Sequence, residues 1–293
     1  MMGKMLNANE IYCGDCVELL KTSPGLPVRL IFADPPFNIG YKYDQYEDRQ
    51  EYDEYVSWTE KWMRACREIL LPDGSFYIAI GDDYAAEVRM IARKLDLHLR
   101  NWIIWHYTFG QQTKMKFARA HTHIFYFVAD PKNFIFNDVP IRMPSARQMV
   151  YKDKRANPAG KIPDDVWRYS RVCGTFKERE GWHTCQMPLK LLARIIKASS
   201  NPGDLVMDPF SGSGTTALAA AILKRQYLAI DLSENYVAAA KERIEKTLND
   251  ESEDIDCGEL IFVLAEKALT ARGKKGIELK LDFEENETAD AHR

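Results

Sequence analysis

Two short loops that begin with Asp-Pro, each placed directly after a run of apolar residues, constrain the fold more than any other feature of this sequence. The first is Asp34-Pro35-Pro36-Phe37, which follows the apolar run Val28–Ala33. The second begins at Asp208-Pro209 and continues into a glycine-rich segment. A continuous apolar run that ends in a turn is typical of a strand buried on both faces of a parallel sheet. Because ligands bind at the carboxyl ends of such strands, we expect both loops to lie at one edge of one sheet.

Outside these loops, short apolar runs alternate with segments whose apolar residues recur at helical spacing. The alternation predicts a doubly wound α/β sheet. Two segments have no regular pattern: the Tyr-rich loop 38–52 and the segment 131–182. We expect the loop 38–52 either to be mobile or to form a lid or stacking surface through Tyr41, Tyr43, Tyr46 and Tyr52. Further strands are predicted at 11–12, 75–80, 101–105, 124–128, 205–207 and 227–230, and helices at 17–21, 54–71, 84–95, 188–198, 214–223 and 234–247.

Charge is unevenly distributed along the chain. The formal net charge is −3, which argues against a protein that binds nucleic acid along its whole length. Residues 110–182, however, contain 14 Lys and Arg against 7 Asp and Glu, whereas residues 250–293 contain 13 acidic against 6 basic residues. A basic middle segment favours contact with a polyanion. We expect a catalytic domain over 1–248, followed over 249–293 by an acidic linker, a short amphipathic helix at 258–271 and a disordered tail.

The sequence does not predict a membrane-bound or secreted protein. No apolar run reaches the roughly 18 residues needed to cross a bilayer. Residues 1–10 lack the apolar stretch of a signal peptide. The 6 cysteines are scattered, which fits reduced thiols better than a framework of disulfides. We therefore expect a cytoplasmic protein.

The segment Gly212–Ala217 matches the G-x-G-x-x-A pattern, which lets a backbone approach a bound nucleotide at the start of a helix. Asp231 follows at the end of the next predicted strand, where a carboxylate accepts hydrogen bonds from ribose hydroxyls. These features alone fit a nicotinamide dinucleotide about as well as S-adenosylmethionine, and a tight turn without a ligand is a third alternative. Asp208 favours S-adenosylmethionine, because Asp-Pro-Phe-Ser separates the strand from the glycines and this carboxylate can face the ammonium group of the cofactor.

The loop Asp34–Phe37 has the composition of a site that grips an exocyclic amine. Two prolines fix the backbone and remove two N–H donors, so the loop presents acceptors without competing donors. The Asp34 carboxylate and the Pro35 carbonyl could accept the two N–H groups of the amine and steer its lone pair toward a methyl group. Phe37 could stack on a base that has swung out of a duplex. A rigid turn with no catalytic role is the alternative for this loop taken alone.

Together these motifs resemble the beta group of amino-directed DNA methyltransferases, in which the catalytic motif precedes the cofactor motif. The resemblance runs from about residue 11 to residue 247. It implies a circularly permuted, Rossmann-like α/β fold with a mostly parallel seven-stranded sheet, S-adenosylmethionine as cofactor and double-stranded DNA as substrate. Asp at position 34, rather than Ser, favours adenine N6 over cytosine N4, which stays the alternative. The residues that the resemblance assigns to catalysis are Asp34, Pro35, Pro36 and Phe37.

The resemblance also assigns residues to the cofactor. Asp15 and Cys16 match a motif that contacts the adenine of the cofactor, and Asp231 replaces a more common Glu. The segment His183–Pro188 resembles the family's motif X but lacks the usual Lys at position 187, so only His183 and Gln186 are carried over. The complete predicted set is Asp15, Cys16, His183, Gln186, Asp208, Phe210, Ser211, Gly212, Ser213, Gly214, Thr215, Thr216 and Asp231.

Basic residues between the core motifs are the predicted contacts to DNA phosphates, because the family keeps its target-recognition insert there, here at about 130–182. Gln111, Gln112 and Asn157 are candidates to read adenine edges. Family members are often dimers, so a homodimer is one candidate assembly, and a restriction endonuclease is another candidate partner. The predicted phosphate contacts are Lys114, Lys116, Arg119, Arg142, Arg147, Lys152, Lys154 and Arg155.

Three other functions stay open. A catalytically inactive module would bind nucleic acid through the basic segment without turnover. The same fold could act on RNA or on a protein amide, although a protein amide leaves the basic segment without a role. A zinc site built on Cys13 and Cys16 with Cys173, His183 and Cys185 is disfavoured, because no second C-x-x-C follows. We predict no metal.

Overall fold

The centre of the protein is an eight-stranded sheet with the strand order β1-β8-β7-β2-β3-β5-β4-β6. This computed structural model describes residues 5–107, 110, 113–249 and 255. All neighbouring strands are parallel except β5, which runs antiparallel to both β3 and β4. The strands are β1 (Glu10–Cys13), β2 (Val28–Ala33), β3 (Leu70–Ile80), β4 (His98–His106), β5 (His121–Val128), β6 (Val166–Arg168), β7 (Leu205–Asp208) and β8 (Gln226–Asp231).

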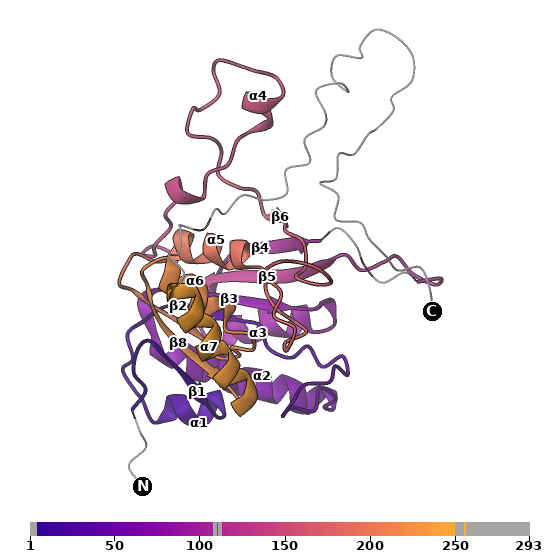
Figure 1. Ribbon diagram of the computed structural model, residues 1–293, viewed down its shortest axis with the longest axis vertical. Helices are drawn as coiled ribbons and strands as arrows, with labels where there is room; N and C mark the ends of the chain where they lie inside the picture. The colour runs from indigo at the N-terminus through magenta and orange to yellow at the C-terminus, as the bar shows by residue number, and fades with distance from the viewer. Residues whose placement is uncertain (1–4, 108–109, 111–112, 250–254, 256–293) are drawn as a thin grey trace.

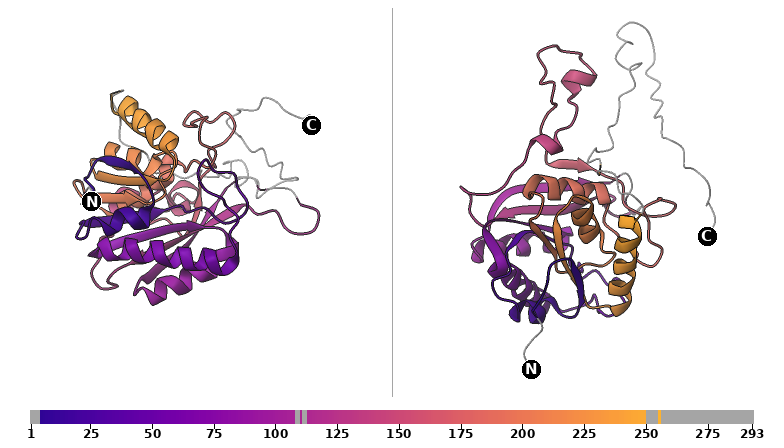
Figure 2. Two further views of the ribbon diagram at one scale, coloured as in Figure 1. Left: turned by 90° about the horizontal axis from the view of Figure 1, so that it is seen from below. Right: turned by 60° about the vertical axis from the view of Figure 1, so that its left-hand side comes forward.

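Helices cover both faces of this sheet (Figures 1 and 2). Alternate residues of β2 point to opposite faces, so Ile31 packs with α2 and α3 while Leu30 and Phe32 pack with α5 and α6. Both faces are apolar, which is why β2 was recognisable as a continuous apolar run. The helices are α1 (Cys16–Lys21), α2 (Tyr52–Ile69), α3 (Ala85–Lys94), α4 (Ala146–Met149), α5 (Leu189–Ser199), α6 (Thr215–Ile222) and α7 (Glu234–Asn249).

The order of the strands along the chain confirms the permuted arrangement. The strands β2 to β5, with the Asp34 loop, precede β7 and β8, with the glycine-rich loop. The prediction of seven strands was wrong by one. The additional strand, β6, has three residues and pairs with β4 through Ile104↔Val166 and Trp105↔Trp167. A segment this short has no periodicity that a sequence could display.

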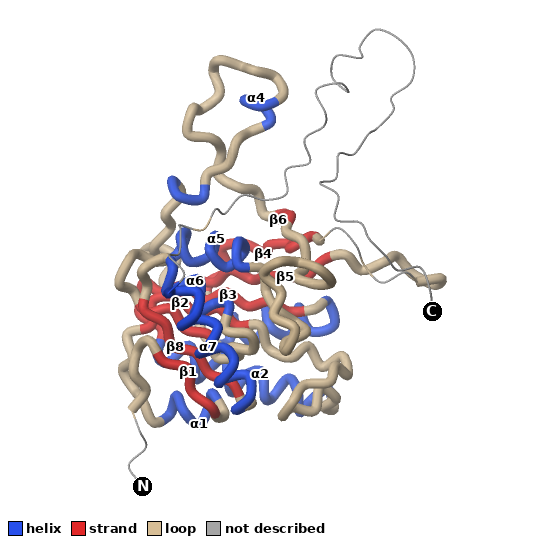
Figure 3. The backbone as a smooth tube through the Cα atoms, in the orientation of Figure 1, coloured by secondary structure: helices blue, strands red, loops and turns tan. Residues whose placement is uncertain are grey.

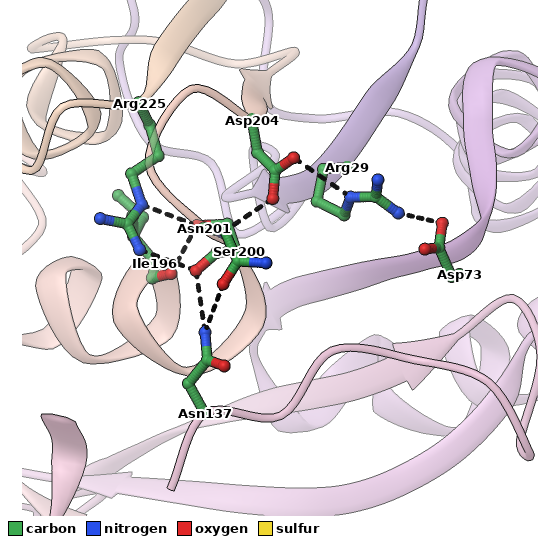
Figure 4. A network of polar contacts seen from close by, with 8 residues as sticks. All are labelled: Arg29, Asp73, Asn137, Ile196, Ser200, Asn201, Asp204 and Arg225. Carbon is green, nitrogen blue, oxygen red and sulfur yellow. Dashed lines mark hydrogen bonds and ion pairs between the residues drawn. The ribbon is translucent and has the colours of Figure 1, made fainter. Parts of the chain in front are cut away.

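The strands are pinned at the edge opposite the Asp-Pro loops by a network of polar contacts (Figure 4). Arg29, on β2, forms ion pairs with Asp73 at the start of β3 and, over 3.4 Å, with Asp204 just before β7. The Asn137 side chain donates to the Ser200 carbonyl over 3.0 Å, which ties the start of the insert to the end of α5. Polar contacts at this edge therefore fasten the strands and α5 to one another, whereas the opposite edge carries the Asp-Pro loops.

The insert between β5 and α5 consists mostly of loop (Figure 3). Its one-turn helix α4 begins with a capping box between Ser145 and Gln148, and a backbone bridge joins Met143 to Lys161. This part stands away from the sheet as an arm (Figure 1). The predicted acidic linker, helix 258–271 and tail lie outside the described residues apart from Asn249 and Ile255, as do Gln111 and Gln112.

Within the described part of the chain, none of the helices combines the length and the apolar character needed to cross a membrane.

Candidate active site

The carboxyl ends of β1, β2, β7 and β8 surround a cavity of about 220 Å³. Asp34 from the first Asp-Pro loop and Asp208 from the second both line it. Asp15, after β1, and Asp231, at the end of β8, line it as well. The expectation that both loops lie at one edge of one sheet is confirmed, and this edge is where parallel sheets bind ligands.

Two glycines shape the loop between β7 and α6. Gly212 has a φ of +48°, and a Cβ added there would lie 2.7 Å from Nε2 of His183. Gly214, the N-cap of α6, has a φ of +73°, and its Cβ would lie 2.8 Å from the Cβ of Ala240. Both positions therefore require glycine. A Cβ atom would clash with a neighbouring side chain, and residues other than glycine are strained at these positive φ angles.

Asp208 is held in the cavity by two hydrogen bonds. Its Oδ1 accepts the N–H of Phe210 over 2.9 Å, and its Oδ2 accepts the hydroxyl of Thr216 over 2.5 Å. The side chain is buried, and loss of water raises the pKa of Asp208 to about 7 despite these two hydrogen bonds. A buried carboxylate of this kind favours a ligand that brings positive charge.

Asp34 and Asp231 add two more acidic groups. Removal from water, and then the charge of Asp208, raise the pKa of Asp34 to about 8. Asp231 accepts the N–H groups of Gly212 over 2.7 Å and of Ser233 over 2.9 Å, and burial raises its pKa. The described residues that line the cavity include no Lys or Arg. Burial, and then the charge of Arg243, lower the pKa of His183 to about 4, so this imidazole is neutral at pH 7.

Three polar atoms of residues that line the cavity are buried without a hydrogen-bond partner. They are Oγ of Ser211, Nδ1 of His183 and the hydroxyl oxygen of Tyr46. Buried polar atoms are normally satisfied, so orphaned atoms beside a cavity favour a polar ligand that completes their bonding. Together with the uncompensated carboxylates, they fit a cofactor that carries an ammonium group, a sulfonium and ribose hydroxyls.

Arg243, from α7, supports the glycine-rich loop from behind. Its guanidinium donates to the Ser213 carbonyl over 2.8 Å and to the Thr215 hydroxyl over 2.9 Å. It also forms an ion pair with Glu180 over 3.2 Å. Sequence reasoning missed this residue, because an Arg in an amphipathic helix is ordinarily exposed to solvent.

The Tyr-rich loop 38–52 covers the cavity and is organised by two aspartates. Asp48 is buried and accepts three backbone N–H groups, from Asn38 over 2.7 Å, Ile39 over 3.0 Å and Tyr41 over 2.9 Å. Asp44 accepts the hydroxyl of Ser233 over 2.5 Å, which fastens the loop to the turn between β8 and α7. The loop expected to be mobile thus has a defined framework.

The comparison with known proteins agrees with this geometry. A family model described as DNA methylase, of the N6/N4 methyltransferase kind, matches residues 28–242. The chain belongs to the N6/N4 DNA methylase family. It is 33% identical over 256 residues to the DNA adenine methyltransferase YhdJ of Escherichia coli (strain K12), which covers 85% of this chain and 86% of YhdJ.

Two solved structures show that this DNA methylase has the fold of known methyltransferases. The M1.HpyAVI–SAM complex matches with a TM-score of 0.60 at 22% identity and covers 80% of this chain and 98% of that one. The cytosine-N4-specific PvuII DNA methyltransferase matches with a TM-score of 0.64 at 20% identity and covers 91% of each chain. The predicted α/β methyltransferase fold is thus confirmed.

Most residues predicted for the site line the cavity of this DNA methylase. Four do not: Pro35 is buried, Phe37 packs beside Gly81, Gly214 caps α6, and Gln186 is buried and bonds to the backbone of residues 178 and 180. Those that do are Asp15, Cys16, Asp34, Pro36, His183, Asp208, Phe210, Ser211, Gly212, Ser213, Thr215, Thr216 and Asp231.

The cavity also has walls that the sequence did not assign to it. Trp58 of α2 lies 5.6 Å, between ring centroids, from Phe210 and lines the cavity. Residues at the start of α7 and in the segment before α5 line another part of the cavity. The additional lining residues are Gly14, Phe32, Tyr43, Asp44, Gln45, Tyr46, Trp58, Cys185, Met187, Leu192, Pro209, Leu232, Ser233 and Tyr236.

The predicted phosphate contacts fall into two separate groups. Lys114, Lys116 and Arg119 belong to the hairpin between β4 and β5, and the other five belong to the arm. All four arginines form ion pairs with carboxylates, and the contacts to DNA phosphates remain a prediction. The pairs are Arg119 with Asp82 and Asp83, Arg142 with Asp138, and Arg147 and Arg155 with Asp153.

In the described part of the chain, Cys13 and Cys16 form no metal-binding group with Cys173, His183 or Cys185, and these cysteines are free thiols. Asp82, His121 and His123 do come within range of a shared ion. However, the indole N–H of Trp102 donates to Nδ1 of His123 over 3.0 Å, and Arg119 already pairs with Asp82. The neutral His123 ring then carries its proton on Nε2, while its Nδ1 is already bonded to Trp102. Neither nitrogen therefore has a free lone pair for a metal ion.

Proposed function

We propose that this chain transfers a methyl group from S-adenosylmethionine to the N6 amino group of adenine in double-stranded DNA. Membership of the DNA methylase family gives the class of reaction. One observation carries the proposal to particular residues: Asp34 lines the same cavity as Asp208 and Asp231. A group that can hold the target amine therefore lies at the groups that can hold the cofactor.

Asp208, Asp231 and the glycine-rich loop hold the cofactor in this proposal. Asp208 faces its ammonium group, Asp231 accepts its ribose hydroxyls, and Ser211 and His183 gain the partners that they lack. When bound, the cofactor supplies a methyl group on a positively charged sulfur. Its positive charge favours the ionised forms of Asp34 and Asp208, whose pKa values burial otherwise raises.

Asp34 positions the adenine. Its carboxylate accepts an N–H of the amino group, which directs the nitrogen lone pair into the cavity and stabilises the positive charge that develops on that nitrogen. The hydroxyl of Tyr55 donates to the Pro36 carbonyl over 2.6 Å and holds the loop in place. Pro35 and Phe37 remain proposed contacts to the base, although neither lines the cavity. The reaction needs no covalent intermediate with the protein.

Cytosine N4 is the second candidate target. The family covers both N6 and N4 enzymes, and the PvuII enzyme with the same fold is cytosine-N4-specific. Asp at position 34 supports adenine, as does the 33% identity to an adenine methyltransferase. A homodimer and a restriction endonuclease partner remain proposals that follow from the resemblance.

The test is transfer from labelled S-adenosylmethionine to unmethylated duplex DNA, followed by digestion to nucleosides and mass analysis. We expect N6-methyladenine. Asp34→Ala should lower turnover by about 100-fold or more, while isothermal titration shows that the cofactor still binds. Detection of N4-methylcytosine instead would show that the target is cytosine N4, the second candidate. Cofactor binding without a methylated nucleoside would refute both and favour an inactive nucleic-acid-binding module.

A further inference from the structure

The hairpin between β4 and β5 leaves the sheet at the edge that carries the candidate active site. Because β5 is antiparallel to both neighbours, β4 ends at the same edge as β2, whose last residue precedes Asp34. Pairing continues past the strands, since the N–H of Tyr107 donates to the Ala120 carbonyl over 3.0 Å. The five residues that precede Ala120 would span about 16 Å if fully extended. Figure 1 shows this hairpin projecting beyond the sheet.

The tip of the hairpin alternates positive and apolar side chains. Met115 is 96% exposed and Phe117 is 99% exposed, more than any other large apolar side chain in the described chain. Lys114 and Lys116 are exposed beside them. The Thr113 hydroxyl donates to the Lys116 carbonyl, which closes the tip into a turn. The protein thus presents two large apolar groups to solvent, framed by cations.

The base of the hairpin is fixed next to the catalytic loop. Arg119 forms ion pairs with Asp82 over 3.1 Å and Asp83 over 3.3 Å, directly after β3. A Cβ added to Gly81 would lie 3.4 Å from the ring of Phe37 and 3.8 Å from the Arg119 guanidinium. The ion pairs of Arg119 therefore anchor the hairpin beside the loop that carries Asp34.

We propose that Met115 and Phe117 form an apolar wedge that enters the base stack of a DNA duplex and fills the space left by the extruded target nucleotide. This inference rests on the proposed function, because Asp34 lies in a cavity that a stacked base cannot reach. A duplex has apolar base faces inside and phosphates outside, which matches the apolar and cationic groups of the tip. Met and Phe are among the side chains that proteins insert between base steps, and Lys114 and Lys116 neutralise the adjacent phosphates.

The experiment compares a double variant, Met115→Ala with Phe117→Ala, against wild type on duplexes that carry the site mapped on plasmid DNA. On the paired duplex, we expect kcat/KM to fall roughly 10- to 100-fold. On a duplex with a mismatch opposite the target adenine, the loss should be about threefold or less, because a mismatched base costs little to extrude. Activity on single-stranded DNA should be unchanged. Met90→Ala, on α3 and 57% exposed, is the matched control and should behave as wild type.

Extrusion is followed separately with 2-aminopurine at the target position, whose fluorescence rises on unstacking. Wild type should raise it and the double variant should not, while Phe117→Leu should retain most of the response. Equal losses on paired, mismatched and single-stranded DNA would overturn the wedge, as would unchanged kinetics. A change in sedimentation that accompanies such equal losses would identify the tip as an interface between copies of this chain instead. If wild type methylates no DNA, the proposed function fails. If wild type methylates DNA but the double variant gives the same 2-aminopurine response as wild type, the wedge alone fails.

Discussion

Replacing Asp208 with Asn separates the charge of this side chain from its shape. Burial raises the pKa of Asp208 from 3.8 to about 7, so ionisation at pH 8 costs the cofactor-free protein about 4 kcal/mol, at 1.36 kcal/mol per pH unit. Asn keeps both hydrogen bonds, since its Oδ1 accepts the Phe210 N–H and its amide donates to the Thr216 hydroxyl. Asp208→Asn should therefore stabilise the cofactor-free protein at pH 8 by up to about 4 kcal/mol, or a few °C per kcal/mol.

The sign of the pH dependence follows from the raised pKa. In the unfolded chain the proton leaves near pH 4, whereas the folded protein keeps it to about pH 7. The contribution of Asp208 to stability is thus complete below pH 4 and is lost as the pH rises to about 7. The melting temperature of the variant should therefore depend less on pH than that of wild type over this range. The affinity of the variant for S-adenosylmethionine should fall, and the increase in affinity that we expect of wild type from pH 6 to 8, as Asp208 ionises, should weaken.

Differential scanning fluorimetry without and with cofactor, at several pH values, measures both effects. Asp73→Asn is the control of opposite sign, because Asp73 forms an ion pair with Arg29 far from the cavity and its loss should lower the melting temperature. If Asp208→Asn melts below wild type at pH 8 without cofactor, the claim that the cavity holds an uncompensated charge is refuted.

Three further changes probe the support around the cavity. Gly212→Ala should cost about 1–2 kcal/mol from its left-handed backbone, with an added clash on His183, and should weaken cofactor binding in calorimetry. Arg243→Met should lower the free energy of unfolding by about 2–3 kcal/mol, measured in urea; an unchanged value would show that its hydrogen bonds to the loop are dispensable. Asp44→Ala removes the link between the Tyr-rich loop and Ser233, so stopped-flow measurements should show faster cofactor release with little change in melting temperature.

The strands that carry the site were predictable because each is a short apolar run that ends in a characteristic loop. Val28–Ala33 was placed with its observed bounds, and the shared edge of Asp34 and Asp208 followed from parallel pairing. The start of β3 was predicted less well. The strand begins at Leu70, directly after α2, whereas we expected a helix to residue 71 and a strand only from residue 75. There, pairing with β2 outweighs the local turn signal.

The supporting groups of the site could not be predicted, because their partners are distant in sequence. Asp48 lies in a polar loop whose composition indicates mobility, yet its buried carboxylate orders three N–H groups. Arg243 pairs with Glu180 and with a loop about 30 residues earlier, a contact that no local pattern announces. Such residues are found when a fold brings their partners together.

The pairing of β1 with β8 has a consequence for how the protein is made. Cys13 and Leu232, whose thiol and carbonyl lie 3.5 Å apart, are separated by 219 positions in the chain. The wall that β1 contributes is synthesised first, and the wall that holds Asp231 comes from one of the last strands. A chain growing on the ribosome therefore lacks this wall until β8 has emerged, so the cavity is completed only late in synthesis.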